Sequence, residues 1–87
     1  NTPAALGRYR IGDDEAFVLV VDYPDPARGR AAVDSAMPDG VAEVDVVETE
    51  DGWIAWRMKG ETRAAFVLGG SSRDVTQTLV DRIGAGG

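Results

Sequence analysis

The chain contains neither cysteine nor histidine among its 87 residues. The first absence excludes disulfides, thiol nucleophiles and thiolate metal sites. The second removes the commonest general base and the commonest ligand of transition metals. Serine–histidine and cysteine–histidine catalysis are therefore excluded. We expect no metal site, no cofactor and no enzymatic activity.

Positive charge is also scarce, because nine lysine and arginine residues stand against fifteen aspartate and glutamate residues, and the net charge is −6. Nucleic acids and anionic membranes bind cationic surfaces, so neither is an expected partner. Long apolar runs are absent too. The longest, AFVLVV at Ala16–Val21, has the length of a strand and not of a membrane-spanning helix. Direct membrane insertion is therefore not expected.

The length and a hydrophobic content of 44% fit one small globular domain. The end sequences NTPAALG and GAGG are typical of linkers. We therefore expect a linker over residues 1–7, a single domain over residues 8–84 and a tail over residues 85–87. Because the chain begins with Asn1 and not with methionine, we expect it to be processed or excised from a longer or membrane-tethered protein, with an extracytoplasmic location favoured.

Hydrophobic periodicity divides the chain into strands and helices. The expected order is strand, strand, helix, strand, strand, strand, helix, with strands at Tyr9–Ile11 and Ala16–Asp22, a helix after Asp25, a meander over residues 41–70 and a helix over residues 71–84. This order predicts an α+β fold. A mostly antiparallel sheet of four or five strands carries two helices, which we expect on one face of the sheet.

Asp25 and Pro26 mark the start of the first helix, since aspartate is a good N-cap and proline is tolerated at the first helical position. Small residues then recur on one narrow face, which predicts that this helix packs closely against the sheet. They are Ala27, Ala31, Ala32, Ser35 and Ala36.

A glycine pair precedes the final helix, in the stretch LGGSSRDVTQ at residues 68–77. Glycine turns that open helices often bind phosphate, but Ser71 and Ser72 stand where the Walker pattern needs lysine followed by serine or threonine. Ser71 and Asp74 have instead the spacing of a capping box. We therefore expect Ser71 to cap this helix, and the turn to bind no anion.

The first turn of the meander decides which residues face each other. A three-residue loop, Glu50–Gly52, aligns Val46 with Trp56, so that apolar side chains meet and opposite charges meet. A two-residue loop aligns Val46 with Ala55 or Arg57. We prefer the three-residue loop.

Strand alternation places Trp53 and Trp56 on opposite faces of the sheet. We expect Trp56 in the core. The face of Trp53 stays open to solvent if both helices cover the core side, and is covered if the helices split between the faces. A tryptophan in a contiguous apolar patch is typical of an interface. We therefore expect a protein partner or a homodimer to bind an outer face formed by Trp53, Val47, Ala55, Arg57, Ala65 and Val67.

Asp22, Tyr23 and Asp25 follow the predicted central strand, and ligands of mixed α/β sheets often bind near strand ends. The alternative function is therefore a small-ligand-binding domain, with a site between the first helix and the sheet near these three residues. Asp25 has a competing role as the N-cap of that helix.

Two resemblances bear on function. The element order is similar to that of the longin/roadblock class of adaptor domains, in which a five-stranded antiparallel sheet carries helices. The segment Trp56–Ile83, WRMKGETRAAFVLGGSSRDVTQTLVDRI, resembles the end of the extracytoplasmic sensor domains of membrane-bound anti-sigma factors, where a tryptophan, a glycine turn, an apolar strand, a serine cap and an amphipathic helix follow in that order. These resemblances imply an interaction or sensor module of a regulatory protein.

Overall fold

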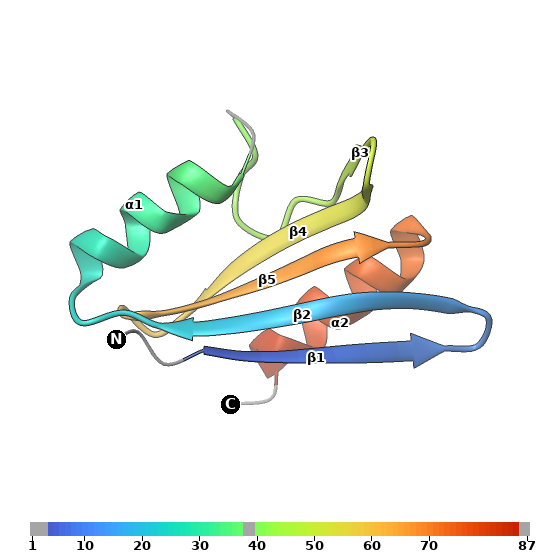
Figure 1. The fold of residues 1–87 in the computed structure, drawn as a ribbon, viewed down its shortest axis with the longest axis horizontal. Helices are drawn as coiled ribbons and strands as arrows, with labels where there is room; N and C mark the ends of the chain where they lie inside the picture. The colour runs from blue at the N-terminus through green and yellow to red at the C-terminus, as the bar shows by residue number, and fades with distance from the viewer. Residues whose placement is uncertain (1–3, 38–39, 86–87) are drawn as a thin grey trace.

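The computed structural model describes residues 4–37 and 40–85. It contains a five-stranded antiparallel sheet with the strand order β1-β2-β5-β4-β3, and two helices (Figure 1). The predicted α+β class and element order are confirmed. In chain order the elements are β1 (Ala4–Ile11), β2 (Asp14–Asp22), α1 (Pro26–Ala36), β3 (Val47–Thr49), β4 (Gly52–Lys59), β5 (Arg63–Gly70) and α2 (Arg73–Ala85).

Strand β1 begins earlier than predicted. It pairs with β2 without interruption from Ala4, opposite Val21, to Ile11, opposite Asp14. Gly12, with a φ of 63°, lets the chain reverse in two residues and so sets this register. The prediction of a linker is therefore wrong for residues 4–7, which belong to the sheet. Residues 1–3 and 86–87 lie outside the described part of the chain.

Strand β5 is the centre of the sheet, between β2 and β4, and is covered on both faces. Ala65 and Val67 face α2, whereas Ala64 and Phe66 face α1. The expectation that both helices lie on one face is wrong. The reason lies in the sequence of β5, because a strand that is apolar at consecutive positions needs cover on both sides.

Two cores result, one on each face of the sheet. The α2-side core consists of Ala16, Val18, Ala55, Val67, Val75, Leu79 and Val80. The α1-side core consists of Val21, Val33, Met37, Ile54, Ala64 and Phe66.

Helix α1 begins as predicted but turns a different face to the sheet. The Asp25 carboxylate accepts a hydrogen bond from the Arg28 amide at 2.9 Å, and Pro26 is in the first turn. Gly29, Val33 and Met37 are the buried residues along this segment. The predicted alanine face is wrong, since Ala27, Ala31, Ser35 and Ala36 are exposed and Ala32 is half-buried. Valine and methionine bury more apolar area than alanine does, and this decides which face packs.

Helix α2 is capped by Ser72 and not by Ser71. The Ser72 hydroxyl accepts from the Val75 amide at 3.1 Å, which is the N-cap bond. Ser71 instead accepts from the Glu15 amide and donates to Asp14, both at 2.9 Å, and so fastens the helix start to β2.

The hairpin between β3 and β4 has the two-residue turn Glu50–Asp51, so the three-residue loop is wrong. Thr49 pairs with Gly52, and its hydroxyl donates to the Gly52 carbonyl oxygen at 2.7 Å. With helices on both faces of the sheet, this register is favourable because Val46 packs against the α2-side core and Val47 against the α1-side core.

Candidate functional site

The face around Trp53 that was expected to be open is covered by α2. Ala55, Ala65 and Val67 are all 0% exposed. Ala55 and Val67 pack in the α2-side core, which includes three apolar residues of the helix. This surface is therefore not available to a partner while α2 is in place. The physical reason is the placement of one helix on each face.

The other residues of the expected interface also have internal contacts. The Arg57 guanidinium donates to the Val80 carbonyl oxygen of α2 at 3.5 Å. Val47 lies on the opposite face, against the α1-side core. Trp53 is half-buried and pairs with Gly70 across the sheet. The structure does not bring these side chains together as one exposed patch.

The second set of expected site residues, Asp22, Tyr23 and Asp25, is held in structural contacts. Asp25 caps α1 and lies 3.6 Å from the Arg28 guanidinium. The Tyr23 amide donates to the Thr62 carbonyl oxygen at 2.8 Å, and its ring packs against the α1-side core. These contacts fix the connection between β2 and α1.

Asp22 and Arg63 form a bidentate salt bridge between β2 and β5. Arg63 Nε donates to Asp22 Oδ1 at 2.6 Å, and Nη2 donates to Oδ2 at 3.2 Å. The pKa of the Asp22 carboxyl lies below its usual value, chiefly because of these hydrogen bonds. Desolvation of the carboxylate opposes this lowering of the pKa, and attraction to the positive charge of Arg63 adds to it. The same bonds raise the pKa of Arg63.

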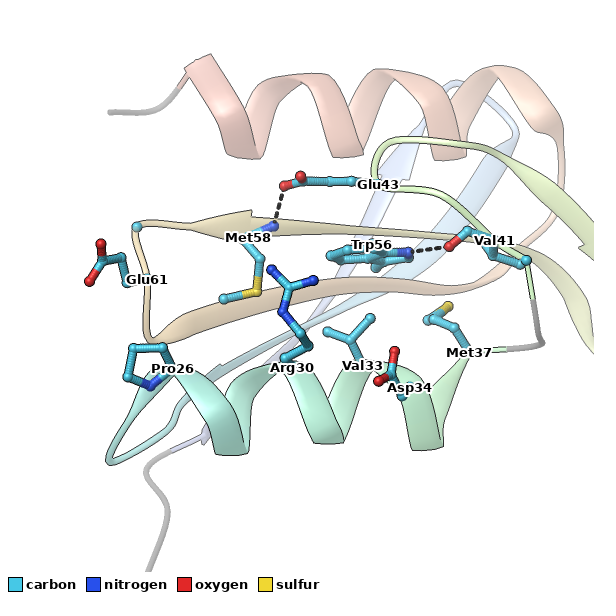
Figure 2. A pocket seen from close by; sticks show the side chains of 12 residues that line it. Pro26, Arg30, Val33, Asp34, Met37, Val41, Glu43, Trp56, Met58 and Glu61 are labelled. Atoms are coloured by element: carbon cyan, nitrogen blue, oxygen red, sulfur yellow. Dashed lines mark hydrogen bonds between the residues drawn. The ribbon is translucent and has the colours of Figure 1, made fainter.

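A cleft of about 780 Å³ lies between α1 and β4. Figure 2 shows α1 on one side of it and the sheet on the other, with α2 beyond the sheet. Val33 and Met37 form the helix wall, and Trp56 and Met58 form the sheet wall. The cleft lies between the first helix and the sheet, as the ligand-binding alternative expected, but Asp22, Tyr23 and Asp25 do not line it.

The sheet wall of the cleft is held in place by two hydrogen bonds, drawn in Figure 2. Trp56 Nε1 donates to the Val41 carbonyl oxygen at 3.0 Å. The Met58 amide donates to Glu43 Oε2 at 2.8 Å. The indole ring therefore has a fixed orientation while it remains half-buried and borders the open space.

The charged residues along the cleft are Arg30, Asp34, Glu43 and Glu61. The Glu43 carboxylate is held by the Met58 amide, and the Glu61 carboxylate points away from the cleft (Figure 2). Arg30 points from α1 toward the sheet (Figure 2). The lining is therefore acidic on balance, in a protein whose net charge is already −6.

The size and lining of the cleft can be compared with those of small-molecule pockets. Its volume falls within the range of about 300–1,000 Å³ that is usual for small-molecule pockets. It combines an aromatic ring, a thioether and aliphatic groups with a few charged groups. Within residues 4–37 and 40–85, no three aspartate or glutamate side chains converge to hold a metal ion.

Trp56 was expected in the core, and the cleft beside it was not predicted. Trp56 and Met58 both face α1, but α1 leaves space in front of them. The sequence does indicate which face of the helix opposes β4, because Gly29, Val33 and Met37 recur at intervals of four residues. How far this helix lies from the sheet depends on the packing of the whole domain.

Comparison of the chain with protein-family models, with curated proteins and with solved structures finds no match. The resemblances to the longin/roadblock class and to anti-sigma-factor sensor domains stay predictions. Neither α1 nor α2, over their described lengths, is long and apolar enough to cross a membrane.

Proposed function

We propose that this domain is a non-enzymatic recognition module whose ligand binds in the cleft between α1 and β4. The proposed ligand is an organic cation, an amine or guanidinium group on an apolar body, either as a small molecule or as a side chain of a protein partner. The observation that carries the proposal is the fixed, half-buried ring of Trp56 in an open cleft whose charged lining residues are three acidic residues and one arginine.

Three physical effects support a cationic ligand. The face of an indole ring attracts a cation, with about 0.5–2 kcal/mol of stabilisation depending on its exposure to solvent. Val33, Met37 and Met58 provide apolar surface for the rest of the ligand. The negative charge of the lining and of the whole domain favours the approach of cations over anions.

Arg30 competes with such a ligand in this arrangement. Its side chain projects into the cleft and is positively charged, as the proposed ligand is (Figure 2). Removing it therefore leaves more room and a more negative lining. An anionic ligand would depend on Arg30 instead, so one substitution separates the two ligand classes.

The test uses phenethylamine and hydrocinnamate, which share a phenyl body and differ in the sign of their charge. The Trp53→Phe variant leaves Trp56 as the only tryptophan, so its fluorescence reports on the cleft. We expect phenethylamine to change this fluorescence saturably and hydrocinnamate not to. Arg30→Ala should tighten phenethylamine binding by about threefold or more, and Asp34→Asn should weaken it.

Preference for hydrocinnamate, with affinity lost in Arg30→Ala, would reverse the proposed ligand class. Absence of a saturable signal with both compounds at millimolar concentration would reject the cleft as a site for ligands of this size. Far-ultraviolet circular dichroism of each variant checks that the fold is retained.

A further inference from the structure

Strand β1 is an open edge of the sheet. It is the outermost strand beside β2, and its eight residues pair without a register shift (Figure 1). Within residues 4–37 and 40–85, no strand pairs with its outer edge, which therefore presents backbone N–H and C=O groups along a regular strand. The opposite edge strand, β3, has only three residues. Proteins usually protect an edge by a short strand, a bulge, a proline or charged side chains, and of these β1 has only the charged side chains of Arg8 and Arg10.

The side chains of β1 on the α1 side of the sheet are exposed and carry positive charge. Leu6 is 67% exposed, and the side chains of Arg8 and Arg10 are 66% and 69% exposed. Both arginines lie near a single carboxylate, that of Glu15, at 3.9 Å and 3.8 Å. The strand itself contains two arginines and no acidic residue, so its own side chains carry positive charge in an acidic protein, with Glu15 of β2 beside them.

Helix α1 does not cover this part of the sheet. Leu6 pairs with Leu19, which is half-buried at the border of the α1-side core. Arg8 pairs with Phe17, whose side chain remains 38% exposed. An apolar strip with two arginines beside it therefore runs along the open edge.

We propose that β1 binds an extended acidic segment of a partner protein, which adds to the sheet as a strand next to β1. The backbone of the segment pairs with the free edge, as in other cases of strand addition. Its carboxylates face Arg8 and Arg10, and an apolar side chain lies beside Leu6. This surface is separate from the α1–β4 cleft, and the proposal does not depend on the ligand of that cleft.

Charge distinguishes this partner from a second copy of the chain. Pairing of two β1 strands brings the arginines of both copies to a joint edge and joins two bodies of net charge −6. Both effects oppose association at low salt. An acidic segment instead meets the basic edge with opposite charge, which speeds encounter and fixes the register.

The test measures binding of three short peptides at low salt. Glutamate alternates with valine in the first, lysine alternates with valine in the second, and glutamate alternates with proline in the third. The third keeps the negative charge but cannot complete a strand ladder. We expect only the first to bind. Amide hydrogen exchange in β1 should slow in that complex, which records the new backbone pairing.

Two double variants with the same change of charge test the arginines. Arg8→Glu with Arg10→Glu should weaken the glutamate–valine peptide by about tenfold or more. Arg73→Glu with Arg82→Glu, on exposed positions of α2, should leave its binding nearly unchanged. Cleft ligand binding, followed by the fluorescence of Trp56, should be the same in both.

Several results would overturn the proposal. They are equal binding of the proline peptide, equal loss of binding in both double variants, no change of exchange in β1, dimerisation through β1 without peptide, and absence of binding at millimolar peptide.

Discussion

At the scale of single residues, Gly70 shows how closely α2 packs on the sheet. A Cβ atom at this position would overlap the Thr76 hydroxyl and lie 3.2 Å from the Trp53 carbonyl oxygen. Thr76 is wholly buried, and its hydroxyl donates to the Ser72 carbonyl oxygen at 3.0 Å. Gly70 therefore allows α2 to pack closely on the sheet.

Gly70→Ala should destabilise the protein by about 1–3 kcal/mol, because the added methyl group overpacks this contact. Thr76→Ala should remove much of that cost in the double variant, since it removes the overlapping hydroxyl. Thr76→Val keeps the bulk and should not. Urea denaturation of the single and double variants measures the coupling. Additive free energies in the Thr76→Ala background would show that Thr76 is not the obstacle.

The salt bridge between Asp22 and Arg63 makes the free energy of unfolding depend on pH. The pKa of Asp22 is lower in the folded state than its ordinary value of 3.8. The interaction with Arg63 therefore contributes fully to the free energy of unfolding above that pH. This contribution is lost as the pH falls below it, because the carboxylate becomes protonated. Asp22→Asn should be less stable than the parent protein at neutral pH. Denaturation at a series of pH values should show the difference shrinking in acid, and a constant difference would contradict the assignment.

At the scale of the elements, the sequence predicts where helices begin better than which face they turn inward. The N-cap of α1 follows from the chemistry of Asp25 and Pro26 alone, because capping is local. For α2 two adjacent serines are equally suitable, and only the contact of Ser71 with β2 leaves Ser72 as the cap. The inward face of α1 also depends on its partner, since Val33 and Met37 meet a sheet and the alanines do not.

Ser72→Ala should cost about 1 kcal/mol and speed exchange of the Val75 amide, because it removes the N-cap bond. Ser71→Ala provides the matched control. It should speed exchange of the Glu15 amide instead and leave the first turn of α2 protected. The two amides are resolved by hydrogen exchange with NMR detection. If Ser71→Ala exposed Val75, the cap assignment would be incorrect.

At the scale of the whole molecule, the two faces of the sheet are packed unequally. On the α2 side, Val80 is 0% exposed and lies in a closed core. On the α1 side, Val33 is buried but borders the open cleft. The continuous apolar run of β5 in the sequence indicates that both faces of the sheet are covered. The sequence did not contain the distance between α1 and the sheet, and therefore not the cleft.

Val80→Ala should lower the free energy of unfolding by about 2–3 kcal/mol, through lost apolar burial and the cavity that remains. Val33→Ala makes the same chemical change beside a space that is already open, so it should cost clearly less. Thermal or urea unfolding of the two variants gives the comparison. Equal costs would mean that the cleft closes in solution.

The central place of β5 has a consequence for how this protein is made. Strand β2 can pair with β5 only after Arg63 has been synthesised, 41 residues after its partner Asp22. During synthesis the first hairpin emerges with both apolar faces bare, and no wider sheet can include it until β5 has left the ribosome. Long-range pairing of this kind slows folding and prolongs exposure of apolar strands. We therefore expect nascent chains that stall before β5 to aggregate or to need a chaperone.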